Sequence, residues 1–345
     1  MLLSLVDAGA SPADAVQGAG AKKSTSASVA KAPPTPAKKP ATATSSVARR
    51  PVRRSTAASR ARAAAAARAL ALPHYRLDDS GDLVPDLRAE AAIIYDPETN
   101  EVLWEENSQA LRSIASLTKM MTAAVFLETD PDLTEKVVIA RSDVYRASTT
   151  RLRSNDRVTT DDLLHLLLIA SDNAAARALA RVSPYGSKGF VTRMNEKAAE
   201  LGLEQTSYAE PSGLLSQNMS SAYDMARLVA MASSDERISS IMRMSTHTVR
   251  TANRRVITVH TTNRLLNMPD VDVRAGKTGF ISSSGYCLAT LLRLPQGGQE
   301  VAVVVLGARS NAGRFLETRN LFTWMSTKLS SIFEAEPPPA PQLLQ

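Results

Sequence analysis

Ser116-Leu117-Thr118-Lys119 is followed directly by the apolar run Met120-Met121-Thr122-Ala123-Ala124-Val125-Phe126-Leu127. These residues have fair helix propensity or pack well in a buried helix, so the run predicts a helix whose first turn holds the motif. Residues three apart lie on one face of a helix, which brings the Ser116 hydroxyl and the Lys119 amine together. A serine paired in this way with an amine indicates an activated nucleophile.

The chemistry of this pair requires a neutral amine. Lys119 can accept the proton of Ser116 only when it is itself unprotonated, and burial or a nearby cation lowers the pKa of a lysine. We expect Lys277 to be that cation. The helix N-terminus at Ser116 also has free backbone N–H groups, which suit the oxyanion that forms during acyl transfer.

Two further triplets follow in the chain, Ser171-Asp172-Asn173 and Lys277-Thr278-Gly279. A triplet of either kind can occur by chance in a sequence of this length, and a lone Ser-x-x-Lys is most often a helix N-cap followed by a solvated lysine. All three in this order mark a serine acyl-transfer site that uses lysine, rather than histidine, to activate its nucleophile. The four histidines have no zinc-ligand spacing, no G-x-S-x-G occurs, and no cofactor or metal is expected.

The hydrophobic pattern changes twice along the chain, from strand to helix and back to strand. We expect strands over 91–95, 101–105, 255–261, 273–280, 285–294 and 300–307, and helices over 161–170, 174–180, 190–201, 222–232 and 314–333, in a pattern that is helical from 114 to about 244. Strands at both ends of a helical middle predict an α+β fold, with one antiparallel sheet flanked by helices and an all-helical subdomain. The catalytic domain is expected over 88–333, before a Pro-rich tail over 334–345.

The basic residues are unevenly distributed. Residues 1–75 hold twelve of the 41 Lys and Arg residues but two of the 34 Asp and Glu residues, so the high isoelectric point belongs to this segment. It has almost no large apolar residues, and we predict that 1–87 is a disordered, basic Ala/Lys/Pro/Arg-rich segment. An anionic envelope polymer is a candidate partner for it; nucleic acid is not expected, because no aromatic residues are interleaved with the basic ones.

The first ten residues end in the small residues Ala8-Gly9-Ala10, as signal peptides do, but the apolar stretch before them is too short for export. We hypothesise that 1–10 is the remnant of a truncated signal sequence and that the protein acts in the periplasm or elsewhere outside the cytoplasm. Cys287 is the single cysteine, so it cannot form an intrachain disulfide, and we predict that it is a core residue.

Five further stretches accompany the three motifs, NEKAAELGL (195–203), TSYAEPSGL (206–214), TNRLL (262–266), GKTGF (276–280) and GYCL (285–288). Together they resemble the low-molecular-weight penicillin-binding proteins, the D-alanyl-D-alanine carboxypeptidase and endopeptidase group of serine peptidases. The segment 210–214 is most similar to the penicillin-binding protein 7 branch, which cleaves D,D cross-links. The chain ends soon after its last predicted helix, so we expect neither the C-terminal β-domain nor the amphipathic anchor of the penicillin-binding protein 5 type.

The resemblance implies a peptidoglycan peptide as substrate, β-lactams as inhibitors and an acyl-enzyme on Ser116, with Lys119 as proton acceptor. It further implies that Ser171 relays the proton to the leaving amine, while Asn173 orients the lysine and the substrate amide. The oxyanion would be held by the N–H groups of Ser116 and Phe280. Substrate would bind along the strand that carries Lys277, Thr278 and Gly279.

The preferred reaction stays open at this level. Arg264 and Arg314 fall where carboxypeptidases of this family tend to have arginines near a terminal carboxylate, so they are either substrate ligands or structural residues. The sequence is therefore compatible with carboxypeptidase activity as well as with endopeptidase activity. A β-lactamase-like hydrolase, in which Glu210 would act as the deacylating base, is also possible, as is a non-catalytic cell-wall-binding module of the same fold.

Overall fold

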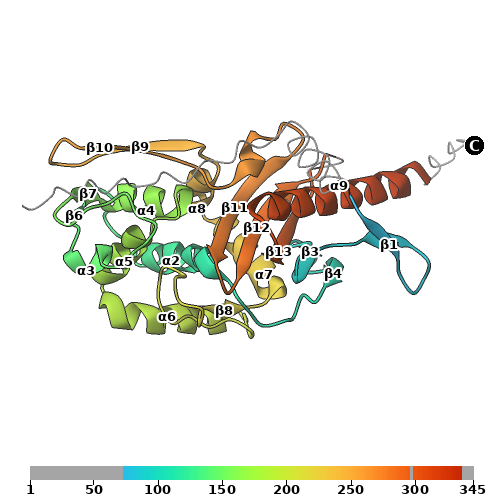
Figure 1. Ribbon diagram of the computed structural model, residues 1–345, viewed down its shortest axis with the longest axis horizontal. Helices are drawn as coiled ribbons and strands as arrows, with labels where there is room; N and C mark the ends of the chain where they lie inside the picture. The colour runs from blue at the N-terminus through green and yellow to red at the C-terminus, as the bar shows by residue number, and fades with distance from the viewer. Residues whose placement is uncertain (1–72, 296–297, 336–345) are drawn as a thin grey trace, which may run out of the picture. The chain divides into compact units, whose positions relative to one another are not determined.

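The computed structural model describes residues 73–295 and 298–335 of the chain (Figure 1). Its main sheet has five antiparallel strands in the order β11-β12-β13-β3-β4. The strands are β3 (Ala91–Tyr95), β4 (Val102–Glu106), β11 (Asp272–Ile281), β12 (Gly285–Arg293) and β13 (Glu300–Ala308). Residues from the two ends of the folded part thus pair in one sheet, and β11 lies at its edge.

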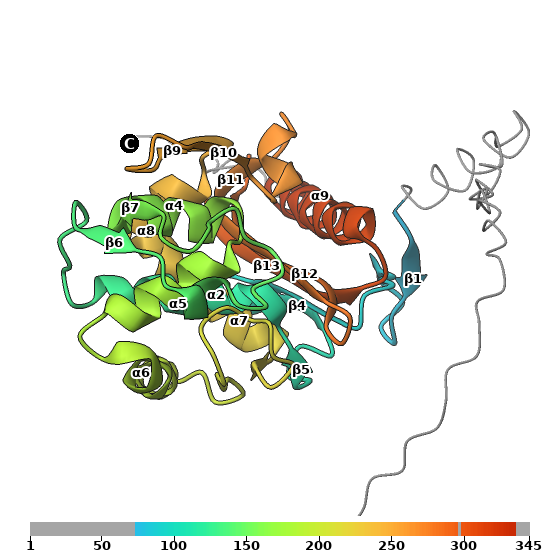
Figure 2. The ribbon, with the colours of Figure 1, turned by 60° about the vertical axis from the view of Figure 1, so that its left-hand side comes forward.

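Alternating residues of the sheet face two separate cores, as the two-residue period of a strand requires. In β13, Ala302 and Val304 pack toward the helical subdomain, whereas Val301 and Val303 pack toward the last helix, α9 (Asn311–Ala335). Figure 2 shows α9 on one side of the sheet and α7 (Ala222–Ser234) and α2 (Thr118–Leu127) on the other. The predicted α+β architecture is confirmed.

The helical subdomain lies between β5 (Arg112–Ser113) and β9 (Thr246–Arg250) in the sequence. It consists of η1 (Ala115–Leu117), α2, α3 (Arg141–Val144), α4 (Thr160–Ile169), α5 (Asn173–Val182), α6 (Gly186–Glu200), α7 and α8 (Glu236–Met242). Every residue of α2 is buried, which explains why its sequence carries no amphipathic pattern. At the start of α4, the Thr159 side chain accepts from the Asp162 N–H and Asp162 returns the bond, which caps the helix.

Short strand pairs interrupt this helical region, and the sequence pattern does not reveal them. They are β5 (Arg112–Ser113) with β8 (Met219–Ser220), and β6 (Lys136–Val138) with β7 (Arg157–Thr159). A third pair joins β9 (Thr246–Arg250) to β10 (Val256–His260). The predicted strand over 255–261 therefore forms its own hairpin over α4, instead of joining the main sheet (Figure 1).

Another hairpin, β1 (Tyr75–Leu77) with β2 (Leu83–Pro85), lies inside the segment 1–87 that the sequence predicts to be disordered. That prediction is wrong for this hairpin, because Val84 is buried and the Trp324 indole of α9 donates to the Leu83 carbonyl at 3.0 Å. The rest of the predicted segment, together with the signal-like residues 1–10, lies outside the described residues, as does the tail beyond 335. Among the described helices, none is long and apolar enough to cross a membrane.

Candidate active site

Ser116 lies in the short 3-10 turn η1, which passes directly into the α-helix that carries Lys119. Leu117 and Thr118 both have right-handed helical backbone angles, and the positive φ of +48° at Ala115 bends the chain just before Ser116. The Lys119 Nζ donates to the Ser116 Oγ at 2.9 Å. The predicted contact of hydroxyl and amine is therefore present.

The Lys119 amine is fully enclosed by protein. It donates to the Asn173 Oδ1 at 2.7 Å and, through a short hydrogen bond, to the Ser212 carbonyl. Burial lowers the pKa of Lys119 to about 7, with a smaller lowering from Arg177 and opposing effects of Glu210 and Asp172. A lysine in this environment is largely neutral just above neutral pH, as a base that activates Ser116 must be.

Ser171 and Asn173 lie where the α4–α5 loop passes into α5. Ser171 has a φ of +59°, and Asp172 caps α5 by accepting from the Ala175 N–H at 3.0 Å. Asn173 is buried at the first turn of α5, where its Nδ2 donates to the Ala147 carbonyl at 2.7 Å. This second bond turns the Asn173 oxygen toward Lys119.

Lys277 enters the site from the edge strand β11. Its Nζ donates to the Ser171 Oγ and to the Thr278 carbonyl, both at 2.9 Å. Burial lowers its pKa well below the usual value, and Lys119 and Arg314 lower it further. The sequence predicts Lys277 as the cation that lowers the pKa of Lys119; burial of Lys119 is the larger cause, and the interaction between the two lysines lowers the pKa of Lys277. Two ammonium groups in one enclosed site repel each other, so both lysines are poor cations here.

Two glycines let the backbones around Ser116 approach closely. A Cβ on Gly279 would lie 2.8 Å from the Ile114 carbonyl oxygen and 3.2 Å from the Ser116 nitrogen. A Cβ on Gly213, whose φ is +76°, would lie 2.0 Å from the Ala115 carbonyl oxygen. Strand β11 and the 210–214 segment therefore press against the turn that presents the nucleophile.

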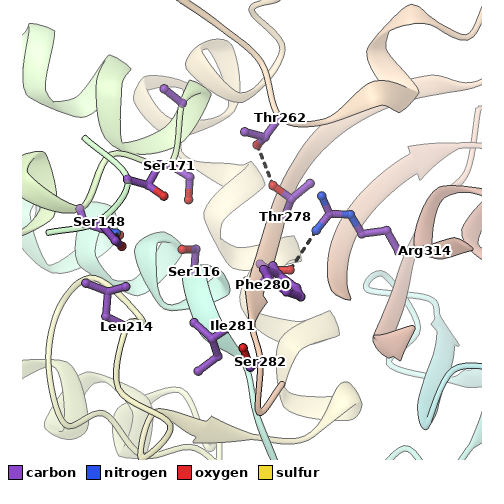
Figure 3. A pocket seen from close by; sticks show the side chains of 14 residues that line it. Ser116, Ser148, Ser171, Leu214, Thr262, Thr278, Phe280, Ile281, Ser282 and Arg314 are labelled. Carbon is purple, nitrogen blue, oxygen red and sulfur yellow. Dashed lines mark hydrogen bonds between the residues drawn. The ribbon is translucent and has the colours of Figure 1, made fainter. Parts of the chain in front are cut away.

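Between the helical subdomain and β11 lies a groove of about 440 Å³. Figure 3 shows Ser116, Ser148 and Ser171 on one side of it and Thr278 and Phe280 on the other. The lining residues are Ser116, Ser148, Thr149, Ala170, Ser171, Asn173, Leu214, Thr262, Thr278, Gly279, Phe280, Ile281, Ser282 and Arg314. The groove thus brings together residues of all three motifs.

The strand wall of the groove carries hydroxyl and aromatic groups. The Thr278 Oγ1 donates to the Thr262 Oγ1 at 2.6 Å (Figure 3). The Phe280 ring is half-exposed and stacks on Tyr286, with ring centroids 4.2 Å apart. Cys287, on the next strand, is fully buried, so its prediction as a core residue is confirmed.

The two arginines have different positions. Arg314 lines the groove, but one of its terminal nitrogens donates to the Gly279 and Cys287 carbonyls and the other to Asn311. Arg264 is exposed, lies over the Phe315 ring at 5.9 Å and does not line the groove. The two arginines are therefore neighbours at the Phe315 ring, but only Arg314 lines the groove.

Glu210 does not face the nucleophile. One of its carboxylate oxygens accepts from the Ser212 N–H and hydroxyl, and the other from the Leu214 N–H at 2.6 Å. The neighbouring Asn218 side chain makes four hydrogen bonds: it accepts from the Ala209 and Glu210 N–H groups and donates to the Glu210 carbonyl and the Thr118 hydroxyl. Glu210 is thus a structural carboxylate, and the β-lactamase-like role considered for it is not compatible with this arrangement.

Several groups of the site are absent from the sequence prediction. The Ser212 carbonyl and the hydroxyls of Ser148 and Thr262 contact motif residues or line the groove. A carbonyl carries no sequence signal, and a serine or threonine outside a motif is indistinguishable from the others. Ser212 and Thr262 do lie in the stretches 206–214 and 262–266, where the resemblance places family-like residues but assigns them no role.

Comparison with known proteins connects this geometry to a family. Residues 79–310 match the peptidase S11 family, described as D-alanyl-D-alanine carboxypeptidase. The chain is 32% identical over 247 residues to the D-alanyl-D-alanine endopeptidase of Escherichia coli strain K12, covering 70% of this chain and 79% of that relative. The corresponding endopeptidase of Pseudomonas aeruginosa is 33% identical over 248 residues, which cover 71% of this chain and 79% of that relative.

A solved structure shows the same architecture. The Streptomyces K15 DD-transpeptidase superposes with a TM-score of 0.65 at 26% sequence identity, covering 70% of this chain and 97% of that protein. The three motif regions and the sheet of the present chain all lie within residues 79–310.

Proposed function

Because the chain belongs to the D-alanyl-D-alanine carboxypeptidase family and is a serine D,D-peptidase, we propose that Ser116 is its nucleophile and Lys119 the base. The observation that carries this proposal is the enclosed Lys119 amine at 2.9 Å from the Ser116 Oγ, with a pKa of about 7. In the first step the Ser116 oxygen attacks the carbonyl carbon of a D-alanyl bond while its proton passes to Lys119. Collapse of the tetrahedral intermediate releases the amine, and water then hydrolyses the acyl-enzyme.

The leaving amine needs a proton, and we propose that the proton taken up by Lys119 reaches it through the Ser171 hydroxyl. The Ser171 hydroxyl lines the groove and accepts from Lys277 at 2.9 Å, so it can pass a proton to an amine bound there. Asn173 holds Lys119 in place and lines the same groove, where it can also meet a substrate amide. The backbone N–H groups of Ser116 and Phe280 are proposed to stabilise the oxyanion.

Substrate is proposed to bind along the free edge of β11. An edge strand has unpaired N–H and C=O groups, so an extended peptide can add to it as a further strand. Lys277 and Thr278 would meet the carboxyl side of the peptide, and Gly279 and Phe280 would flank the scissile bond. Arg314 supports this edge by donating to the Gly279 carbonyl at 2.9 Å.

Endopeptidase activity on D,D cross-linked peptidoglycan peptides is the function that this site supports best. Both arginines considered for a terminal carboxylate are poorly placed, since Arg264 is outside the groove and the terminal nitrogens of Arg314 already donate within the protein. The endopeptidase relatives from Escherichia coli and Pseudomonas aeruginosa, at 32% and 33% identity, also support endopeptidase activity. Carboxypeptidase activity is the second candidate, because Arg314 still lines the groove.

From the substrate class we propose that the protein acts outside the cytoplasm, where cross-linked peptidoglycan lies, and contributes to cell-wall remodelling and cell shape. β-Lactams are proposed to acylate Ser116 as substrate mimics. Binding of the basic N-terminal segment to an anionic envelope polymer is a separate proposal that rests on its charge alone.

Incubation of the purified protein with cross-linked muropeptide dimers and, separately, with free pentapeptide tests the proposal. Loss of dimers identifies an endopeptidase, and release of terminal D-alanine identifies a carboxypeptidase. Labelling by a fluorescent penicillin, abolished in Ser116→Ala, tests the nucleophile. A folded protein that is neither labelled nor active would instead be a non-catalytic module of the same fold.

A further inference from the structure

Two further hollows extend the active-site groove toward the β9–β10 hairpin. The first, of about 290 Å³, shares Thr149, Ala170 and Thr262 with the groove. The second, of about 480 Å³, shares Thr150, Arg151 and Thr258 with the first. We call the two together the arginine trough; its lining residues are Thr149, Thr150, Arg151, Leu152, Arg153, Ala170, Asp172, Arg255, Val256, Ile257, Thr258, Val259, His260 and Thr262.

The trough carries exposed positive charge. Arg151 and Arg153 are exposed, and neither guanidinium forms an ion pair or hydrogen bond with any of the residues 73–295 and 298–335. Three further exposed arginines surround the nearby strand ends and hairpin turn, and they too lack ion pairs within that part of the chain. They are Arg157, Arg250 and Arg254.

The backbone that carries these arginines is held by buried carboxylates. The Arg151 N–H donates to Asp172 and the Arg153 N–H to Asp156, both at 2.7 Å. Leu152 between them is buried, so the side chains on either side of it are directed outward. The two carboxylates thus bind the backbone beneath the trough, and the guanidinium groups of Arg151 and Arg153 are left for another partner.

Arg255 joins the hairpin to this loop. One of its terminal nitrogens donates to the Arg151 carbonyl at 3.0 Å and also pairs with Asp156. Its Nε is buried at the trough and has no acceptor among the described residues. A buried donor without a partner is costly, so this position favours an acceptor from a bound molecule.

We propose that the arginine trough binds carboxylate groups of an acidic peptide substrate at a distance from its scissile bond. The proposal rests on the proposed function, because it places the remote part of the same substrate in a continuation of the same groove. A guanidinium pairs bidentately with a carboxylate, and those of Arg151 and Arg153 project from a backbone fixed by Asp172 and Asp156 and are unpaired among the described residues. Stacking of nucleobases is disfavoured, since none of the lining residues is Phe, Tyr or Trp.

Binding of substrate to a catalytically inactive variant tests the proposal without turnover. The full chain with Ser116→Ala is titrated with a cross-linked acidic peptide dimer and with the same dimer whose side-chain and α-carboxyl groups are amidated. We expect the acidic dimer to bind about tenfold more tightly, as two charge-assisted contacts in a partly exposed site allow. Adding Arg151→Ser and Arg153→Ser should reduce this ratio to near one, and Arg151→Lys with Arg153→Lys should restore part of it.

The matched control removes two exposed cations elsewhere. Lys188 on α6 and Arg309 after β13 form no ion pair within the part of the chain that the structure describes, so Lys188→Ser with Arg309→Ser changes the net charge equally. The control should keep the tenfold ratio. Equal ratios in the trough variant and the control would overturn the proposal, as would an arginine effect seen only with a phosphodiester polymer.

The activity of the unsubstituted enzyme separates this proposal from the proposed function. Turnover of a small neutral D-alanyl substrate and labelling by penicillin depend on Ser116 and its neighbours, not on a remote carboxylate. If the enzyme shows turnover and labelling but binds acidic and amidated dimers equally, the proposed function stands and the proposal for the arginine trough is wrong. If the protein binds the acidic dimer more tightly but neither turns over substrate nor is labelled, the proposed function is wrong.

Discussion

The two walls of the active-site groove are built in contrasting ways. On the helical wall, Ser116, Lys119 and Asn173 sit on buried elements and are joined by hydrogen bonds of 2.7 and 2.9 Å. The strand wall is the free edge of a sheet, where Thr278 and the half-exposed Phe280 face the groove. The contrast indicates that the helical wall holds the reacting groups in a fixed, dry environment, whereas the strand wall is open to pair with substrate.

The largest effect is expected from removing the nucleophile of the helical wall. Ser116→Ala should lower turnover of a D-alanyl substrate by about 10⁶-fold, as loss of a serine nucleophile does elsewhere, and abolish labelling by penicillin. Intact-mass spectrometry after incubation with a β-lactam provides the measurement. A covalent adduct on another residue would show that the assignment of Ser116 is wrong.

Substituting arginine for Lys119 on the helical wall and, separately, for Lys277 on the strand wall compares the two walls directly. Lys119→Arg should lose at least about 10³-fold in acylation rate, because a guanidinium stays protonated and cannot accept the serine proton. Lys277→Arg keeps hydrogen-bond donors on the strand wall and should lose less. Stopped-flow acylation by a chromogenic β-lactam measures both rates. An active Lys119→Arg enzyme would contradict the proposed mechanism, and equal losses would remove the distinction between the walls.

The close packing behind Ser116 can be tested with a pair of glycines of matched backbone. Gly213 and Gly298 have φ values of +76° and +77°, but a Cβ on Gly298 would meet nothing within 4 Å. Gly213→Ala should therefore destabilise the fold by about 2 kcal/mol more than Gly298→Ala, through overlap with the Ala115 carbonyl. Chemical denaturation measures the difference. Similar losses of stability in both variants would mean that the backbone at Ala115 shifts to accommodate the added methyl group.

The burial of Lys119 predicts the pH dependence of acylation. The base is the neutral amine, which is the minor form below a pKa of about 7 and the major form above it. The rate should therefore rise about tenfold per pH unit below pH 7 and level off above it, as the fraction of neutral amine does. Second-order acylation rates between pH 5 and 9 supply the test. A rate that kept rising tenfold per unit up to pH 9 would indicate an exposed lysine with an ordinary pKa.

The smallest effect is expected from removing residues 1–72. Both walls of the groove, and every contact described for them, involve residues after 72. The truncated protein should keep its melting temperature and its turnover of a small D-alanyl substrate, within the error of calorimetry and a continuous assay. Salt-dependent binding to intact sacculi is the property that could change. Loss of the fold or of small-substrate turnover would show that this segment contributes to the walls.

The sequence predicts the elements well where the period of the side chains is strong. The strands of the main sheet, the capped helix α4 and the long last helix all lie within a few residues of their predicted bounds. It fails where short strands pair within the helical region and where β1 and β2 form a hairpin from residues of a predicted disordered segment. Strands of two or three residues are too short for a period to be recognised, and a partner elsewhere in the chain stabilises them.

For the site, the sequence by itself determined the identity and order of the reacting groups, and the contact between Ser116 and Lys119. That contact is local, because a helical turn brings residues three apart together whatever surrounds them. Only the tertiary structure decided that burial, not Lys277, is the main cause of the low pKa of Lys119. It likewise decided that Arg314 lines the groove and its neighbour Arg264 does not, since burial and contacts between distant residues depend on packing that no local pattern contains.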